Sequence, residues 1–257
     1  MLRFATLASG SRGNASLVES GDTLLMLDCG LPCREIEQRL AAVGRSGDDV
    51  AALLVTHEHT DHLRGVGAFA RRYGTRIFAT YGTARALLAL PGSEGLDIEA
   101  VSTHRGFSIG AIGVEPFPVP HDAHEPCQFV FAAGGRRLGV LTDAGHATAH
   151  IRERLAGCDA LAIECNHDVE SLVRGSYPPF VKARVGSAYG HMSNAQAAEL
   201  VASLADGRLQ WVVAMHVSER NNSHALVLDA LEPVLDRRAT RLAIAEQDAP
   251  SAWIEVV

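Results

Sequence analysis

The sequence lacks any apolar run longer than an ordinary strand, so it contains no predicted membrane-spanning helix. Its first residues, "MLRFATLASG", also lack the apolar segment that a secretory signal needs. Cysteine is sparse: the five cysteines are scattered, and "CGLPC" is neither CxxC nor half of a thiolate cage. We therefore expect a cytoplasmic protein with reduced thiols and no membrane segment.

Positive charge is also scarce in this chain. Lys182 is the single lysine, and the formal net charge is −7. This balance excludes a protein whose whole surface attracts nucleic acid, so a polyanionic substrate would need a local basic patch. Nearly all the cations are arginines, whose planar guanidinium groups suit phosphate.

The length and composition are those of a folded globular chain. Hydrophobic residues make up 47% of the 257 residues and charged residues 21%, which argues against disorder. An α/β chain of this length commonly folds as one unit, and no repeat or low-complexity linker interrupts it. We predict a single domain that spans residues 1–257, and the sequence leaves a homodimer open.

Apolar runs between turn residues predict strands, and apolar residues at helical spacing predict helices. The predicted strands cover residues 2–8, 15–20, 23–30, 50–55, 76–80, 107–119, 127–133, 136–143, 160–165, 210–216, 240–246 and 253–257. The predicted helices cover residues 34–44, 61–74, 82–90, 146–157, 224–235 and a segment capped by Ser193. Gly134 and Gly135 predict a hairpin turn. Because strands and helices alternate in both halves, we predict two sheets packed face to face with helices outside.

Residues 56–62, "THEHTDH", place three histidines and an aspartate after the apolar run "VAALLV". His57 and His59 project to the same side of an extended segment. Asp61 and His62 fall where a helix is expected to begin, a position that tolerates an aspartate. Four nitrogen and oxygen donors in one short loop suit zinc, manganese or iron. The alternative is a polar surface loop with coincidental histidines, which this density of donors disfavours.

Three further donors stand at the ends of apolar runs. His121 ends "VEPFPVPH", Asp143 ends "RLGVLTD" and His216 ends "QWVVAMH". Each is therefore predicted to lie at the carboxyl end of a strand, the usual edge for ligand sites in α/β sheets. The sequence thus predicts one metal site to which several strand ends contribute.

In chain order the donors form the motif His-x-His-x-Asp-His followed by His, Asp and His, which resembles the metallo-β-lactamase fold in its dinuclear hydrolase form. The resemblance runs almost end to end and implies an α/β fold, an αββα sandwich of two mixed sheets flanked by helices. It also implies two divalent metal ions. The first would be held by His57, His59 and His121, and the second by Asp61, His62 and His216, with Asp143 bridging them. A hydroxide that bridges the metals would be the nucleophile, so no serine or cysteine is required.

Other segments resemble the phosphodiesterase branch of that fold, which includes tRNase Z. A closer resemblance, to the YycJ group (also called WalJ), rests on five segments: "LASGSRGNASLV", "HDAHEPCQF", "ECNHD", "YPPFVKARVGSAYGHMSN" and "HVSERNN". Departures such as Met192, where leucine is usual, remove no proposed ligand. The resemblance implies a nucleic-acid phosphodiesterase, and above all a DNA exonuclease.

The same resemblance places His191, in "GHMSN", near the metals as a catalytic residue together with Asp61. A histidine there could protonate the leaving group or stabilise the charge of the transition state. A capping or core histidine is the alternative. His167, in "ECNHD", is a substrate-side candidate, and a structural hydrogen bond explains it equally well.

Three cations are candidates for substrate binding. Arg12 lies in the glycine-rich turn "SGSRGN", whose amides could hold an anion, although an ordinary β-turn explains the same string. Lys182 and Arg184 precede His191 and could contact a nucleic-acid backbone. A solvated charged surface is the alternative for both.

Two other functions stay open at this point. A hydrolase of a small ester, such as a cyclic phosphodiester or a thioester, would use the same metals in a closed pocket, and the pI near 5.9 is compatible with it. A regulatory protein that binds metal without turnover is disfavoured, because structural zinc sites usually close at four ligands and this chain offers more.

Overall fold

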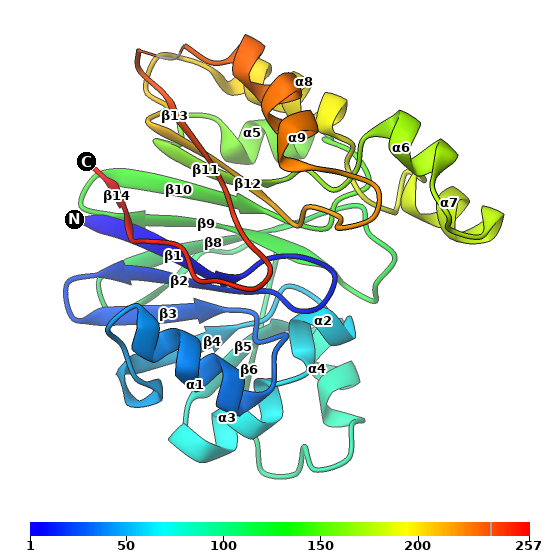
Figure 1. Ribbon diagram of the computed structural model, residues 1–257. Helices are drawn as coiled ribbons and strands as arrows, with labels where there is room; N and C mark the ends of the chain where they lie inside the picture. Colours follow the sequence, from blue (N-terminus) through cyan, green and yellow to red (C-terminus); the bar gives the residue numbers. More distant parts are fainter. Residues whose placement is uncertain (237) are drawn as a thin grey trace.

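Two seven-stranded sheets form the centre of the computed structural model, which describes residues 1–236 and 238–257 (Figure 1). Sheet 1 contains, in spatial order, β14 (Ile254–Val256), β1 (Leu2–Ala8), β2 (Ala15–Ser20), β3 (Thr23–Leu27), β4 (Val50–Leu54), β5 (Arg76–Thr80) and β6 (Ile98–Val101). Sheet 2 contains β13 (Arg241–Ile244), β12 (Trp211–Met215), β11 (Ala160–Glu164), β10 (Arg136–Leu141), β9 (Cys127–Ala133), β8 (Ile112–Pro118) and β7 (Phe107–Ile109). Both sheets are mixed, since β3 to β6 and β10 to β13 pair in parallel and the remaining neighbours pair antiparallel.

Helices cover the outer face of each sheet (Figure 1). Those on the side of sheet 1 are α1 (Cys33–Ala42), α2 (Thr60–Leu63), α3 (Val66–Tyr73) and α4 (Tyr81–Leu88). Those on the side of sheet 2 are α5 (Ala149–Leu155), α8 (Asn194–Leu204) and α9 (His224–Leu231). Two more helices, α6 (Val169–Arg174) and α7 (Pro179–Val185), project beyond the sandwich, and short 3₁₀ turns lie at η1 (Gly47–Asp49) and η2 (Glu232–Val234). The predicted αββα sandwich is confirmed.

The strands are apolar on both faces because each sheet lies between the other sheet and a helix layer. In β3, Leu25 and Leu27 belong to the central cluster between the sheets, whereas Leu24 and Met26 pack toward the helices. The central cluster also takes Phe129 from sheet 2. This two-sided burial explains why the sequence shows continuous apolar runs at these strands.

Several boundaries differ from the sequence prediction. The predicted helix 61–74 is divided into α2 and α3 at Gly65, because the Gly65 amide donates to the Cys29 carbonyl oxygen at 2.7 Å and the Asp61 carbonyl oxygen accepts from the Asn14 amide instead of from Gly65. The predicted strand 107–119 is the hairpin of β7 and β8, which turns at Gly110 with φ 53°. The predicted turn at Gly134 and Gly135 is confirmed, with φ values of 59° and 77°.

The two ends of the chain lie side by side, because β14 pairs with β1 in the register Leu2 to Val256 (Figure 1). The carboxyl ends of the parallel strands in both sheets point to the opposite edge of the sandwich. Among the described helices, none is long and apolar enough to span a bilayer. The edge where the strands end is where the predicted donors gather.

Candidate metal centre

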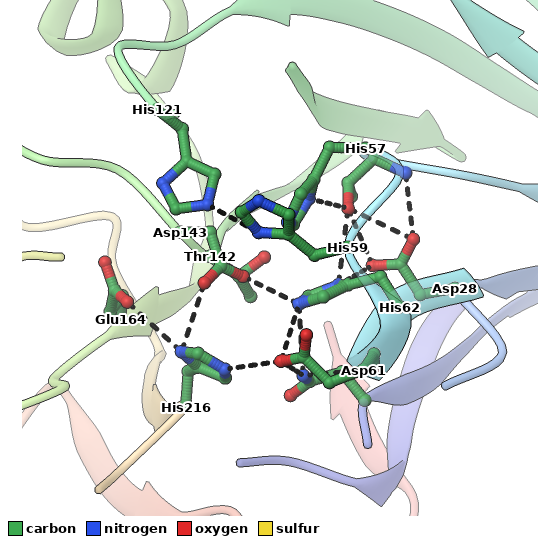
Figure 2. Close-up of polar contacts among 12 residues, drawn as sticks. Asp28, His57, His59, Asp61, His62, His121, Thr142, Asp143, Glu164 and His216 are labelled. Carbon is green, nitrogen blue, oxygen red and sulfur yellow. Dashed lines mark hydrogen bonds and ion pairs between the residues drawn. The ribbon is translucent and has the colours of Figure 1, made fainter. Parts of the chain in front are cut away.

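The candidate centre is built at the carboxyl ends of strands from both sheets, with side chains directed toward one another (Figure 2). Sheet 1 contributes the loops after β3 and β4, and sheet 2 the segments that follow β8, β10, β11 and β12. This is the edge that α/β sheets commonly use for ligands, because the chain leaves every parallel strand there.

All seven predicted donors meet at this edge. Ligand atoms lie within 4.8 Å of one another in four groups: His57, His59 and His121; His57, His62 and Asp143; Asp61, His62 and His216; and Asp143, Glu164, His191 and His216. The first and third groups are the sets that the resemblance to the metallo-β-lactamase fold assigned to two separate ions. Asp143 shares a group with members of each set, so it lies between them.

The polar atoms of this cluster fit a divalent cation. His57 Nε2 is buried and has no hydrogen-bond partner in the described structure. Asp143 Oδ2 is buried beside it and lies 2.9 Å from His62 Nε2. Leaving a buried ring nitrogen unpaired is costly, and a bound metal ion would satisfy it. Imidazole and carboxylate donors of this kind are suited to divalent metals.

Hydrogen bonds behind the histidines fix which ring nitrogen faces the centre. His62 Nδ1 lies 2.8 Å from Asp28 Oδ2, and His57 Nδ1 lies 2.9 Å from Thr56 Oγ1. His121 Nδ1 lies 3.0 Å from the carbonyl oxygen of Gly190 and must donate to it. Each ring therefore presents Nε2 to the cluster, the arrangement that orients histidine ligands in metal sites.

The backbone is held in an unusual conformation at three positions of this edge. Within residues 1–236 and 238–257, the residues other than glycine that have a positive φ are Asp28 at 59°, Asp143 at 43° and His216 at 52°. Left-handed backbone is uncommon outside glycine, and its cost is tolerated where the surroundings enforce it. Each of the three residues follows a strand, at the point where the chain turns at the edge that carries the cluster. The strained backbone therefore lies where the side chains of the candidate site are positioned.

The electrostatics of the cluster separate its histidines into two kinds. Burial opposes the charged form of His62, but Asp143, Asp28 and Asp61 raise its pKa well above the usual value. Burial, together with the neighbouring histidines, lowers the pKa of His57 well below that value. Although burial raises the pKa of Asp143, the nearby histidines outweigh burial and lower its pKa strongly. The cluster thus holds an anionic carboxylate among imidazoles that differ in their affinity for protons.

Glu164 is a member of the cluster that the sequence analysis missed. Its side chain is completely buried, and Oε1 lies 2.7 Å from His191 Nδ1 and 3.2 Å from His216 Nδ1. Its Oε2 accepts hydrogen bonds from the backbone amides of Ala144 and Met192 at 3.1 and 3.0 Å. Glu164 ends the apolar run "ALAI", the same signal that identified Asp143, and Asp28 follows "TLLML" in the same way.

His191, which the resemblance placed near the metals, lies beside the carboxylates of Asp143 and Glu164. Its Nδ1 lies 3.1 Å from Asp143 Oδ1 as well as close to Glu164, and 20% of its side chain is exposed. Burial opposes protonation, but Glu164 and Asp143 raise its pKa well above the usual value. The ring therefore favours the protonated form and presents its opposite nitrogen, Nε2, away from the carboxylates.

The substrate candidates differ in their exposure and in their contacts around this centre. Arg12 is half-exposed and forms ion pairs with Glu219 and Asp248 at 2.7 and 2.6 Å. It lines a cavity of about 560 Å³ that also contacts Asp61. His167 is only 3% exposed, and its ring nitrogen Nδ1 is buried with no hydrogen-bond partner among the described residues, so the structural hydrogen bond considered for this side chain is not found there.

Lys182 and Arg184 both lie on α7. Arg184 Nε contacts Asp122 Oδ2 at 2.5 Å, and Asp122 Oδ1 lies 3.4 Å from His121 Nε2 and 3.8 Å from His59 Nε2. Lys182 Nζ donates to the Val173 carbonyl oxygen at 2.6 Å. Arg184 therefore adjoins the histidine cluster through Asp122, whereas Lys182 is held against the end of α6.

Comparison with known proteins gives the class of this chain. A family model described as "Beta-lactamase superfamily domain" matches residues 23–217. The chain therefore belongs to the β-lactamase superfamily, in its metal-dependent hydrolase fold.

Within that class the chain is similar to two curated bacterial proteins. Exodeoxyribonuclease YycJ of Bacillus anthracis is 34% identical over 238 residues, which cover 92% of this chain and 90% of the relative. Exodeoxyribonuclease WalJ of Streptococcus pneumoniae is 35% identical over 225 residues, which cover 86% of this chain and 83% of the relative. The resemblance to the YycJ group is confirmed.

A solved structure shows the same fold at lower identity. The metallo-β-lactamase fold protein YhfI from Bacillus subtilis superposes with a TM-score of 0.74 at 14% identity, covering 98% of this chain and 99% of that one. This likeness extends over the whole chain and supports the sandwich architecture alone.

Proposed function

We propose that the protein is a metal-dependent phosphodiesterase that acts on nucleic acid in the cytoplasm, with DNA shortened from one end as its principal reaction. One observation carries the proposal: the seven donors lie together at one edge of the sandwich, and the partly exposed His191 lies beside them. Similarity to two exodeoxyribonucleases over more than four fifths of the chain supports DNA as the substrate.

In this proposal the seven donors hold two divalent metal ions. His57, His59 and His121 bind one ion, and Asp61, His62 and His216 bind the other, with Asp143 shared between them. When bound, such ions activate water for attack and offset the negative charge that develops on phosphate. Asp28 and Thr56 keep the rings of His62 and His57 in the orientation that binding needs.

The chain itself supplies the proton for the leaving group in the proposed reaction. Glu164 and Asp143 face His191 Nδ1 and favour its protonated form. The proton on Nε2 is then placed on the side of the ring that faces away from these carboxylates. A histidine with this environment can donate to the departing oxygen of a phosphodiester as a general acid.

The accessibility of the cluster favours a polymer over a small enclosed ester. Side chains of His59, Asp61 and His191 are 28%, 26% and 20% exposed, so a substrate reaches them from solvent. The cavity of about 560 Å³ beside Asp61 offers room for groups beyond the reacting phosphate. A small cyclic phosphodiester or thioester would not need this additional space.

The test is a comparison of substrates with the metal-loaded protein. We expect stepwise shortening of end-labelled single- or double-stranded DNA, together with hydrolysis of bis(p-nitrophenyl) phosphate. RNA and a thioester serve as comparison substrates, and the Asp143→Ala variant controls for contaminating nuclease. Thioester cleavage without any phosphodiesterase activity would refute the proposal, and turnover of the small diester without DNA cleavage would replace the polymer with a small phosphodiester.

A further inference from the structure

The segment 169–190, which we call the α6–α7 arm, exposes an unusual amount of apolar surface. Val169, Val173, Phe180 and Tyr189 expose 53%, 67%, 75% and 62% of their surfaces. No residue of α7 is buried. The arm projects from the sandwich at the edge where the metal-site strands end (Figure 1). Large side chains held in solvent in this way indicate a surface that contacts something else.

The charge of the arm is opposite to that of the chain. It carries three cations, Arg174, Lys182 and Arg184, and one anion, Glu170, whereas the whole chain has a net charge of −7. Glu170 forms an ion pair with Arg174, Arg184 Nε contacts Asp122 Oδ2, and Lys182 Nζ donates to the Val173 carbonyl oxygen, so these contacts hold the three cations at the surface of the arm. Three cations still outnumber the two carboxylates beside them, so the arm is a local basic patch of the kind that an acidic protein needs to hold a polyanion.

The arm is joined directly to the metal centre. Its last residue, Gly190, accepts the hydrogen bond of His121 Nδ1 at 3.0 Å, and the His191 amide donates to the Val185 carbonyl oxygen at 2.9 Å. A Cβ on Gly190 would lie 2.2 Å from the carbonyl oxygen of Arg184, so the return from α7 is closely packed. The arm therefore lies next to the candidate metal centre, close to where the end of a bound nucleic-acid strand would be held.

We propose that the α6–α7 arm is a platform for single-stranded nucleic acid, on which unpaired bases stack against Phe180 and Tyr189 while Lys182 and Arg184 lie along the phosphates. This inference rests on the proposed function and names the form of substrate that the site receives. Exposed aromatic rings interleaved with cations bind single strands because every unpaired base offers a face for stacking. A second copy of the chain is a poorer occupant, because a two-fold contact between arms would bring the cation excess of one arm against that of the other.

The direct test measures the binding of a fluorescently labelled oligothymidylate to the metal-loaded protein by fluorescence anisotropy. Its phosphorothioate linkages resist cleavage, so a dissociation constant can be determined. For Phe180→Ala we expect the dissociation constant to rise about tenfold, the effect of removing one stacking ring. Phe180→Trp should restore binding close to the native value. The matched control is Leu88→Ala, which removes a side chain of 54% exposure at the end of α4 and should leave binding unchanged.

A second measurement compares cleavage of a long strand with cleavage of bis(p-nitrophenyl) phosphate, which is too small to reach the arm. The ratio of the two activities should fall about tenfold in Phe180→Ala. An unchanged dissociation constant and ratio in Phe180→Ala would overturn the platform. Conversion of a dimer to a monomer without a change in strand binding would also overturn it, in favour of self-association.

The two proposals fail in different ways. If the native protein cleaves no phosphodiester while strand binding still depends on Phe180, the platform stands and the proposed reaction is wrong. If the protein degrades DNA and Phe180→Ala binds the strand as tightly as the native protein, the reaction stands and the platform is wrong.

Discussion

Asp143 lies between the two donor sets of the proposed metal centre. It is 2% exposed, has a φ of 43°, and lies 2.9 Å from His62 Nε2 and 3.3 Å from His216 Nδ1. Asparagine has almost the same shape and tolerates a positive φ, but it lacks the anionic oxygen that a shared metal ligand supplies. Asp143 can therefore be tested without a large change in packing.

For Asp143→Asn we expect a large loss of bound metal and a fall in phosphodiester turnover of at least about 100-fold. Metal content by plasma mass spectrometry and hydrolysis of bis(p-nitrophenyl) phosphate measure the two effects. Asp97→Asn is the matched control, because Asp97 is exposed, forms an ion pair with Arg76 and is not part of the donor cluster. Native metal content together with a native rate in Asp143→Asn would show that Asp143 is not a ligand.

The raised pKa of His216 leads to a prediction of how metal binding depends on pH. Burial opposes its charged form, but Asp143, Asp61 and Glu164 raise its pKa to about 9, above the value of about 6.5 in an unfolded chain. In the metal-free protein, protonated His216 therefore adds to the free energy of unfolding. This contribution is fully present below about pH 6.5 and is lost as the pH rises through about 9. A metal ion must displace this proton before the ring can bind it.

The increase in Tm on adding zinc or manganese should therefore be small near pH 6 and grow toward about pH 9. Thermal unfolding with and without metal, at a series of pH values, measures this difference. A metal-induced increase in Tm that shrinks as the pH rises over this range would contradict the proton competition at His216.

At the scale of elements, the loop after β3 is held against α2 by its backbone. The Asn14 amide donates to the Asp61 carbonyl oxygen at 2.7 Å, and the Gly30 amide donates to the Asn14 carbonyl oxygen at 2.8 Å. A Cβ on Gly30 would lie 1.6 Å from the Asp61 carbonyl oxygen. Glycine is therefore required at position 30 by close contact of two backbones, and the position of Asp61 depends on it.

Gly30→Ala should lower the free energy of unfolding by about 1–3 kcal/mol or more and weaken metal binding, because α2 must move away. Gly67→Ala is the matched control: its Cβ would lie 3.5 Å from Arg71 Nη1, an ordinary contact, and alanine should stabilise α3 by about 0.5–1 kcal/mol. Urea unfolding measures both variants. Equal stability of Gly30→Ala and the native protein would show that the backbone contact is not limiting.

At the scale of the whole molecule, we propose that residues 1–257 form one domain. The central cluster takes Phe4 from sheet 1 and Phe129 from sheet 2, and β14 at the end of the chain pairs with β1 at its start. Separating the halves would expose this shared core, so the two sheets are expected to unfold together.

The two tryptophans of the chain allow a test of this cooperativity. Trp211 lies on β12 in sheet 2, and the Trp253 indole donates to the Val43 carbonyl oxygen beside sheet 1. Trp211→Phe and Trp253→Phe each leave one fluorescent reporter. Within each variant, the urea midpoint from that reporter should equal the midpoint from circular dichroism. Separate midpoints would contradict the single domain.

Part of the fold was predictable because its signals are local. The apolar runs marked most strands, and the glycine pair at 134–135 marked a hairpin. Helix α7 gave only a weak signal, since it has seven residues, none of them is buried, and only Val181 and Val185 repeat at helical spacing. The break at Gly65 was equally hidden, because the carbonyl oxygen that accepts from its amide belongs to Cys29, more than thirty positions earlier.

The sequence by itself determined which donor types the site contains, because each donor follows a strand-forming run and strands of one direction end at one edge. Only the tertiary structure decided which donors face one another. Glu164 meets His216 because β11 and β12 lie side by side in sheet 2, it meets His191 because the segment after α7 returns to the end of β11, and Asp61 meets His216 because the two sheets pack together. Contacts between segments this far apart in the chain depend on sheet order and packing, which residue spacing does not record.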